Sequence, residues 1–234
     1  MQFQHAEKAV DADLVTYEVR GDIALVGLNR PAKRNAISDR FIEAIAVAVA
    51  RAEEDAKAAV IYGHGDHFCA GLDLAEHVKK TPIEGVKGSR RWHAVFAQIE
   101  HGMIPWVSAL HGAVVGGGLE LALCGDIIVA SETAKFGLPE IRLGMMPGGG
   151  GTQTLPRLIG KPLAKELMWT GRRITAEEAK EYRLVNHVVP AGGAVEKARE
   201  LAAAIAANAP LPVMFTTPPT EFAFHECLRC KGNL

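Results

Sequence analysis

Hydrophobic and polar positions along the chain alternate between short β-branched runs and longer stretches of helical periodicity. The apolar runs 14–19 and 22–28 are separated by a turn dipeptide and predict a hairpin. Ser38 is suited to cap a helix that runs to about Asp55, because apolar residues recur there at helical spacing. The same patterns predict strands at 58–62, 105–110, 126–131 and 183–190, and helices at 89–100, from about 151, and at 161–170, 175–181 and 195–208.

The order of these elements is strand, strand, helix, then strand, loop, helix, strand and helix. This coarse repeat predicts an α/β architecture built from successive strand–strand–helix units. Residues 80–88 are polar and contain two glycines, so we expect an irregular link there before the helix at 89–100.

Composition and charge limit the binding partners and the cellular compartment that we expect. The chain has 234 residues, of which 48% are hydrophobic, and a formal net charge of −1. This charge gives no general attraction to nucleic acid or to an anionic membrane. Residues 1–15 lack the pattern of a signal peptide, and no apolar run reaches the length of a membrane span. Cys69 and Cys124 are isolated, and Cys227 and Cys230 form half of a zinc or redox motif, for which two reduced thiols are the favoured interpretation. We therefore expect a cytoplasmic protein with no metal, no membrane partner and no nucleic-acid partner.

Glu120 lies in an unusual setting, the stretch VVGGGLELALCGD at residues 114–126. In a helix, its neighbours three and four positions away are two glycines, a leucine and a cysteine, none of which neutralises a charge. A surface carboxylate near the helix start is the alternative interpretation. A carboxylate in apolar surroundings has a raised pKa, which suits a general acid or base near neutral pH. The flanking leucines favour this functional interpretation.

Three further segments carry candidate chemistry. The glycines at 116–118 form a tight turn or a cradle of N–H groups for a phosphate or an oxyanion. The phosphate option is weakened because no Walker or GxGxxG pattern is present. The segment FCAGLDL, residues 68–74, is a turn after a strand or a second N–H donor. Glu140 follows Pro139 between apolar residues, and two such carboxylates could divide the acid and base roles.

Four segments in this order resemble the crotonase superfamily, the enoyl-CoA hydratases and isomerases. The segments are LNRPAKRNAIS, HFCAGLDL, SALHGAVVGGGLELALCGDIIVAS and FGLPEIRLGMMPGGGGTQTLPRLIG. The resemblance runs from about Leu14 to Leu211. It implies a crotonase-type spiral of strand–strand–helix units, assembled as a homotrimer or a dimer of trimers. On this basis we expect a spiral core domain over residues 1–190. A shortened C-terminal helical segment and irregular tail would follow over 191–234, with an atypical pattern after about residue 212.

The resemblance also implies the site. The substrate would be an acyl-CoA thioester, so coenzyme A is part of the substrate and no cofactor is expected. The thioester carbonyl would lie between the N–H groups of Ala70 and Gly117. Glu140 would deliver a proton to carbon 2, and Glu120 would position and activate water. The residues implied to contact the substrate and its CoA moiety are Ala32, Lys33, Arg34, Ala36, Ala70, Gly71, Leu72, Asp73, Leu74, Gly116, Gly117 and Pro139.

Within the superfamily, the two glutamates favour a 2-enoyl-CoA hydratase, with isomerase side activity as an option. An enoyl-CoA isomerase is the alternative enzyme. A non-catalytic acyl-CoA-binding homologue and an RNA-binding homologue are the non-enzyme alternatives. The helix after residue 38 lacks a lysine stripe, which disfavours RNA binding. His64 and His67 have metal-like spacing but no third ligand, so a solvated loop is favoured. Trp92 and Phe96 are expected in the core or in the wall of an acyl pocket.

Overall fold

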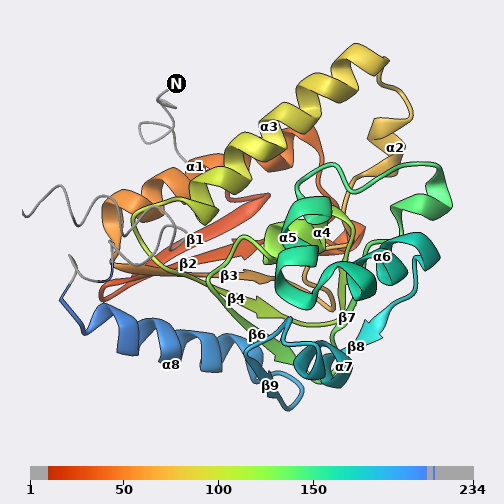
Figure 1. The fold of residues 1–234 in the computed structure, drawn as a ribbon. Helices are drawn as coiled ribbons and strands as arrows, with labels where there is room; N and C mark the ends of the chain where they lie inside the picture. Colours follow the sequence, from red (N-terminus) through yellow and green to blue (C-terminus); the bar gives the residue numbers. More distant parts are fainter. Residues whose placement is uncertain (1–9, 210–212, 214–234) are drawn as a thin grey trace, which may run out of the picture.

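A six-stranded sheet forms the centre of the fold (Figure 1). The computed structural model describes residues 10–209 and residue 213. The strand order is β1-β2-β3-β4-β6-β9. The predicted hairpin is confirmed as the antiparallel pair β1 and β2, and the remaining neighbours pair in parallel. The strands are β1 (Val15–Arg20), β2 (Ile23–Leu28), β3 (Ala58–Gly63), β4 (Trp106–Leu110), β6 (Ile127–Ser131) and β9 (His187–Val189).

Helices cover both faces of this sheet. α1 (Asp39–Asp55) and α3 (Pro82–Glu100) lie over one face, and α8 (Ala194–Ala206) lies over the other (Figure 1). Ser38 caps α1 as predicted, because its side chain accepts a hydrogen bond from the Phe41 N–H. Successive strand residues point to opposite faces, so Ala24 and Val26 pack in the core under α1 while Leu25 packs in the second core under α8.

A second, smaller sheet gives the chain its spiral course. Its order is β5-β7-β8, comprising Ala113–Val115, Lys135–Gly137 and Ile174–Thr175. β4 is followed by β5 and by the short helix α4 (Gly117–Ala122), and β6 is followed by β7, the 3-10 helix η2 (Glu140–Leu143) and α5 (Gly151–Ile159). Each such unit places one strand in each sheet. The predicted α/β spiral is therefore confirmed, although the sequence patterns indicate loops where these short strands lie.

The start of α3 differs from the sequence prediction. The polar residues 80–88 predict an irregular link, but α3 already begins at Pro82. The Thr81 hydroxyl accepts from the Glu84 N–H, and the Glu84 carboxylate accepts from the Thr81 N–H. This capping box, with a proline in the first turn, outweighs the cost of the two glycines inside the helix.

The remaining elements connect these layers. They are η1 (Pro31–Lys33), α2 (Leu74–His77), α6 (Lys161–Thr170) and α7 (Ala176–Glu181). Within residues 10–209, no helix has the length and apolar character needed to cross a membrane. The expectations for the tail after residue 213, including Cys227 and Cys230, lie outside the described residues.

Candidate active site

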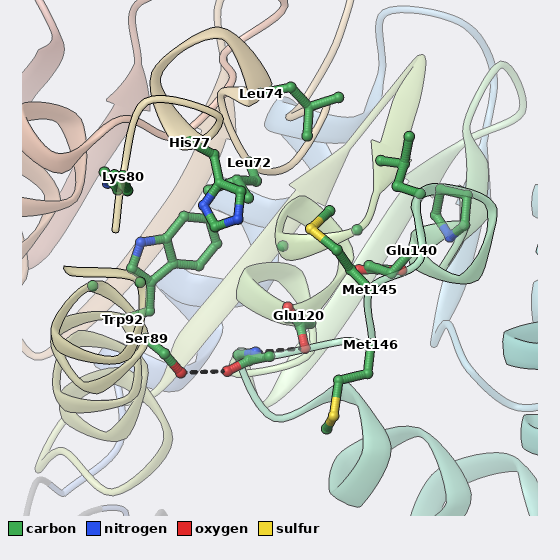
Figure 2. Close-up of a pocket in the computed structure, with 18 of the residues that line it drawn as sticks. Leu72, Leu74, His77, Lys80, Ser89, Trp92, Glu120, Glu140, Met145 and Met146 are labelled. Carbon is green, nitrogen blue, oxygen red and sulfur yellow. Dashed lines mark hydrogen bonds between the residues drawn. The ribbon is translucent and has the colours of Figure 1, made fainter. Parts of the chain in front are cut away.

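A cavity of about 210 Å³ opens where α3, α4, η2 and the loop before α5 meet. Figure 2 shows the side chains of Trp92, Glu120, Glu140 and Met145 around this space. The residues that line it are Ala70, Leu72, Leu74, His77, Lys80, Gly85, Gly88, Ser89, Trp92, Gly116, Gly117, Glu120, Pro139, Glu140, Leu143, Met145, Met146, Gly148 and Gly149.

Glu120 lies in the first turn of α4, and only 5% of it is exposed. Its side chain is therefore buried, but the carboxylate has polar backbone partners that the sequence does not indicate. One oxygen, Oε1, accepts hydrogen bonds from the N–H groups of Gly149 and Gly151, each at 2.8 Å. Burial raises the pKa of Glu120 above its usual value, while the two N–H groups act in the opposite direction. The backbone thus stabilises the carboxylate form of Glu120, and the nearby charge of His93 acts in the same direction.

Glu140 begins η2 and is also buried. Its Oε2 atom is buried without a hydrogen-bond partner. Burial raises the pKa of Glu140 to about 7, and the nearby charge of Glu120 adds to this effect. The carboxyl group is close to Gly116, where a Cβ atom would lie 3.2 Å from Glu140 Oε1. The two carboxyl groups of this pocket therefore have different environments. At neutral pH one of them can be ionised while the other is protonated.

One of the two predicted oxyanion donors, the Ala70 N–H, already has a partner within the protein. The Ala70 N–H donates to the Arg34 carbonyl at 2.9 Å, so it is not free for a ligand. Among the described residues, the Leu72 and Gly117 N–H groups make no such bond, and both residues line the pocket. The family resemblance implies Ala70 as the donor of this segment. In the structure, Ile37 pairs with the residues on either side of Leu72, so the unpaired N–H is that of Leu72.

Gly71 allows these two donor segments to come together. Its φ is +89°, and an added Cβ would lie 2.8 Å from the Val115 carbonyl oxygen and 3.1 Å from the Gly117 nitrogen. A side chain at position 71 would therefore separate the segment of Leu72 from the start of α4. The pair of N–H groups at Leu72 and Gly117 is the arrangement that suits a developing oxyanion.

The residues implied to contact the substrate divide into two groups. Those that line the pocket are Ala70, Leu72, Leu74, Gly116, Gly117 and Pro139, and those that do not are Ala32, Lys33, Arg34, Ala36, Gly71 and Asp73. The Asp73 carboxylate instead caps α2 and pairs with Arg30 at 2.7 Å. Lys33 and Arg34 are exposed on and beside η1, so their contact with a CoA moiety stays a prediction.

Several wall residues were not identified from the sequence. On α3, the residues that face the pocket are Gly85, Gly88, Ser89 and Trp92. They lie on one face of the helix because they are spaced three or four positions apart. The sequence prediction begins this helix at residue 89, so the helical spacing of the two glycines with Trp92 is not visible in it. Trp92 is both buried and part of the wall, as expected, and an added Cβ at Gly117 would lie 2.2 Å from its ring.

The other wall residues come from segments without a periodic signal. His77 ends the short helix α2 and Lys80 follows it, and Met145 and Met146 lie in the loop after η2. No hydrophobic period marks these positions.

The two histidines with metal-like spacing have protein partners. His64 Nε2 lies 2.7 Å from the Thr16 hydroxyl, and His67 Nδ1 accepts from the Ala113 N–H at 3.1 Å. These bonds give both imidazoles a structural role in the loop beside β3.

Comparisons with known proteins identify the family that this chain resembles. The profile of the enoyl-CoA hydratase/isomerase family matches residues 18–221. A short-chain-enoyl-CoA hydratase from Clostridium acetobutylicum is 38% identical over 202 residues, which cover 85% of this chain and 77% of the relative. An enoyl-CoA hydratase from Mycobacterium tuberculosis is 41% identical over 84% of this chain and 76% of its own. The crystal structure of an enoyl-CoA hydratase from Bacillus anthracis matches with a TM-score of 0.86 at 34% identity, covering 94% of this chain and 90% of the other.

Proposed function

Because the chain belongs to the enoyl-CoA hydratase/isomerase family, we propose that it adds water across the 2,3 double bond of an enoyl-CoA thioester. The single observation that carries this proposal is the pair of buried glutamates in one pocket. Glu120 has two backbone donors on one oxygen, and Glu140 has an oxygen without any. Such a pair supplies one ionised and one protonated carboxyl group at the same pH.

The thioester carbonyl would be held by the Leu72 and Gly117 N–H groups. Hydrogen bonds to this oxygen withdraw electrons from the conjugated double bond and make carbon 3 electrophilic. They also stabilise the enolate that forms when oxygen is added at carbon 3. The free N–H groups in the pocket wall support this assignment.

The two glutamates would then carry the proton transfers of the addition, while a water molecule supplies the hydroxyl group. A proton must pass back from Glu120 to Glu140 before the next turnover. Glu120, ionised with the help of its two N–H bonds, takes a proton from water as the oxygen bonds to carbon 3. Glu140 delivers a proton to carbon 2, which its raised pKa permits near neutral pH. Oxygen and one hydrogen are added at carbon 3 and one hydrogen at carbon 2, so the product is a 3-hydroxyacyl-CoA.

Turnover of crotonyl-CoA tests the proposal directly. We expect the absorbance of the conjugated thioester to decay and 3-hydroxybutyryl-CoA to form. A 3-enoyl-CoA assayed in parallel measures isomerase activity, for which the same two proton-carrying groups would suffice. Tight binding of crotonyl-CoA without any product would instead support a non-catalytic acyl-CoA-binding protein.

The assembly expected from the resemblance, a homotrimer or a dimer of trimers, is part of the proposal. Exposed apolar side chains on η2, α5, α6 and the loop after η2 support it, namely Ile141, Leu143, Met146, Leu158 and Trp169. α6 packs against both η2 and α5, so these side chains belong to neighbouring elements. Light scattering of the full chain tests this part, since a monomeric mass would contradict it.

A further inference from the structure

Ser89 on α3 is linked to Glu120 through one peptide group. The Ser89 hydroxyl donates to the Gly148 carbonyl at 3.1 Å. The next N–H along the chain, that of Gly149, donates to Glu120 Oε1 at 2.8 Å. Both bonds are drawn in Figure 2. The carbonyl of residue 148 and the N–H of residue 149 belong to the same planar peptide unit, so each end of this unit is held by a side chain.

Among the described residues, this peptide unit makes no hydrogen bond besides these two. It lies between two glycines, whose backbones can rotate into conformations that other residues rarely adopt. Neither glycine has a side chain that could anchor the loop to α3 or α4. Rotation of the unit would turn the Gly149 N–H away from Glu120 and would bring a carbonyl oxygen towards it. The Ser89 hydroxyl opposes this rotation because the rotation breaks its bond to Gly148.

The bond from Ser89 also affects how well the N–H donates. A hydrogen bond accepted by a peptide carbonyl polarises the whole unit and strengthens donation by its N–H. A hydroxyl at position 89 would therefore act on Glu120 both through geometry and through polarisation. Its hydroxyl has this one hydrogen bond among the described residues.

We propose that Ser89 is a positioning residue for Glu120, acting through the peptide group that joins Gly148 to Gly149. The part of this inference that concerns turnover rests on the proposed hydratase function. The part that concerns the state of the Glu120 carboxyl group does not.

Other charged and titratable groups around Glu120 are unchanged by substitution of Ser89. They are Glu140 on η2, His93 on α3 and Cys124, which follows α4. His77 and Lys80 also line the pocket, and Lys80 is paired with Asp39 and Glu76. The second donor to Glu120, the Gly151 N–H, is also retained. A change in the titration of Glu120 can therefore be assigned to the single peptide unit that Ser89 holds.

The matched variants are Ser89→Thr and Ser89→Val. They have nearly the same shape and the same branched Cβ, and only threonine retains the hydroxyl. The carboxyl groups of the full chain are titrated by 13C NMR after labelling of the glutamates. The Glu120 signal is assigned by its loss in Glu120→Gln. Hydration of crotonyl-CoA is measured against pH in the same variants.

We expect the pKa of Glu120 to be higher in Ser89→Val than in Ser89→Thr by about 0.5 units, because a weaker N–H bond stabilises the anion less. We also expect kcat to be lower in the valine variant by about threefold to tenfold, with KM nearly unchanged. The acid limb of its rate profile should move to higher pH. If valine disturbs the helix, Ser89→Ala compared with the wild type gives the same test.

Identical titration of Glu120 in the two variants would overturn the inference, even with an active wild type. A rise in KM with an unchanged titration would overturn it too, because it would indicate direct contact between Ser89 and the substrate. A difference in titration in a wild type that hydrates no enoyl-CoA would support the inference and contradict only the proposed function.

Discussion

Glu120 and Glu140 line the same pocket, but their carboxyl groups differ in the hydrogen bonds that they accept from the backbone. Two N–H groups converge on Oε1 of Glu120, whereas Oε2 of Glu140 is buried without a partner. Each negative charge raises the free energy of the other, so the pair favours one ionised and one protonated member. The asymmetry of hydrogen bonding selects Glu120 as the ionised one.

Replacing either glutamate by glutamine should abolish most of the activity. Glutamine keeps the size of the side chain but can neither take nor deliver a proton at this pH. We expect kcat for crotonyl-CoA hydration to fall at least about a hundredfold in Glu120→Gln and in Glu140→Gln. Thermal unfolding of both variants serves as the control for the fold. A loss of less than about tenfold in both would contradict the acid–base roles.

The rate should fall on the basic side of neutrality. Glu140 must be protonated to deliver a proton, and its pKa lies at about 7. We expect kcat/KM to decline as the pH rises through this value. Steady-state rates measured across buffers of equal ionic strength check this expectation. A rate that stays constant well into the basic range would show that another group supplies the proton.

The stability of the fold should depend on Glu140 with a defined sign. The pKa of Glu140 is 4.5 when the side chain is free in water, as in the unfolded chain, and about 7 in the folded protein. Between these values the folded chain binds more protons than the unfolded chain, so the free energy of unfolding falls as pH rises. Glu140→Gln lacks this decline and should gain up to about 3 kcal/mol over the wild type between about pH 4 and pH 8. Urea denaturation at the two pH values measures the difference.

Gly118 should tolerate no side chain. An added Cβ would lie 2.4 Å from the Cys69 carbonyl oxygen, which is a backbone atom and cannot move aside alone. Gly118→Ala should lower the free energy of unfolding by about 2 kcal/mol or more. Gly85→Ala is the matched control, since an added Cβ there meets nothing within 4 Å and alanine favours the helix. Equal stabilities of the two variants would contradict the close approach of α4 to residue 69.

Asn35 should be essential for the loop that carries the donor segment. It is fully buried, and its Nδ2 donates to the carbonyls of His64, His67 and Phe68. In Asn35→Asp an acceptor of the same shape would face three carbonyl oxygens. We expect a loss of roughly 3 kcal/mol or more. The loss should grow from about pH 5 to pH 8, because keeping the buried carboxyl group protonated costs more as the pH rises above its unfolded-state pKa. Urea denaturation with Asn35→Ala as the comparison checks the pH dependence.

The long elements and the two glutamates could be predicted from the sequence because their signals are local. The apolar period behind Ser38 and the β-branched runs of β1 and β2 determine those elements by themselves. The strands of the small sheet are two or three residues long, and only their tertiary pairing defines them. The free N–H at Leu72 likewise depends on which neighbouring N–H pairs with the Arg34 carbonyl. A sequence motif indicates the segment, but it does not indicate which of its amides is unpaired.

The contacts that hold Glu120 come from main-chain atoms of a glycine run, whereas other parts of the pocket lining are the side chains of Met145, Met146 and Trp92. Substitutions at Met145 or Met146 can therefore change the shape of the pocket without removing a hydrogen-bond donor to Glu120. If the proposed hydratase function holds, this separation allows the chain-length preference to be altered while both glutamates stay in place. An insertion or a proline within residues 148–151 would instead remove or displace the N–H donors to Glu120. We expect such a change to lower the hydration rate for every substrate.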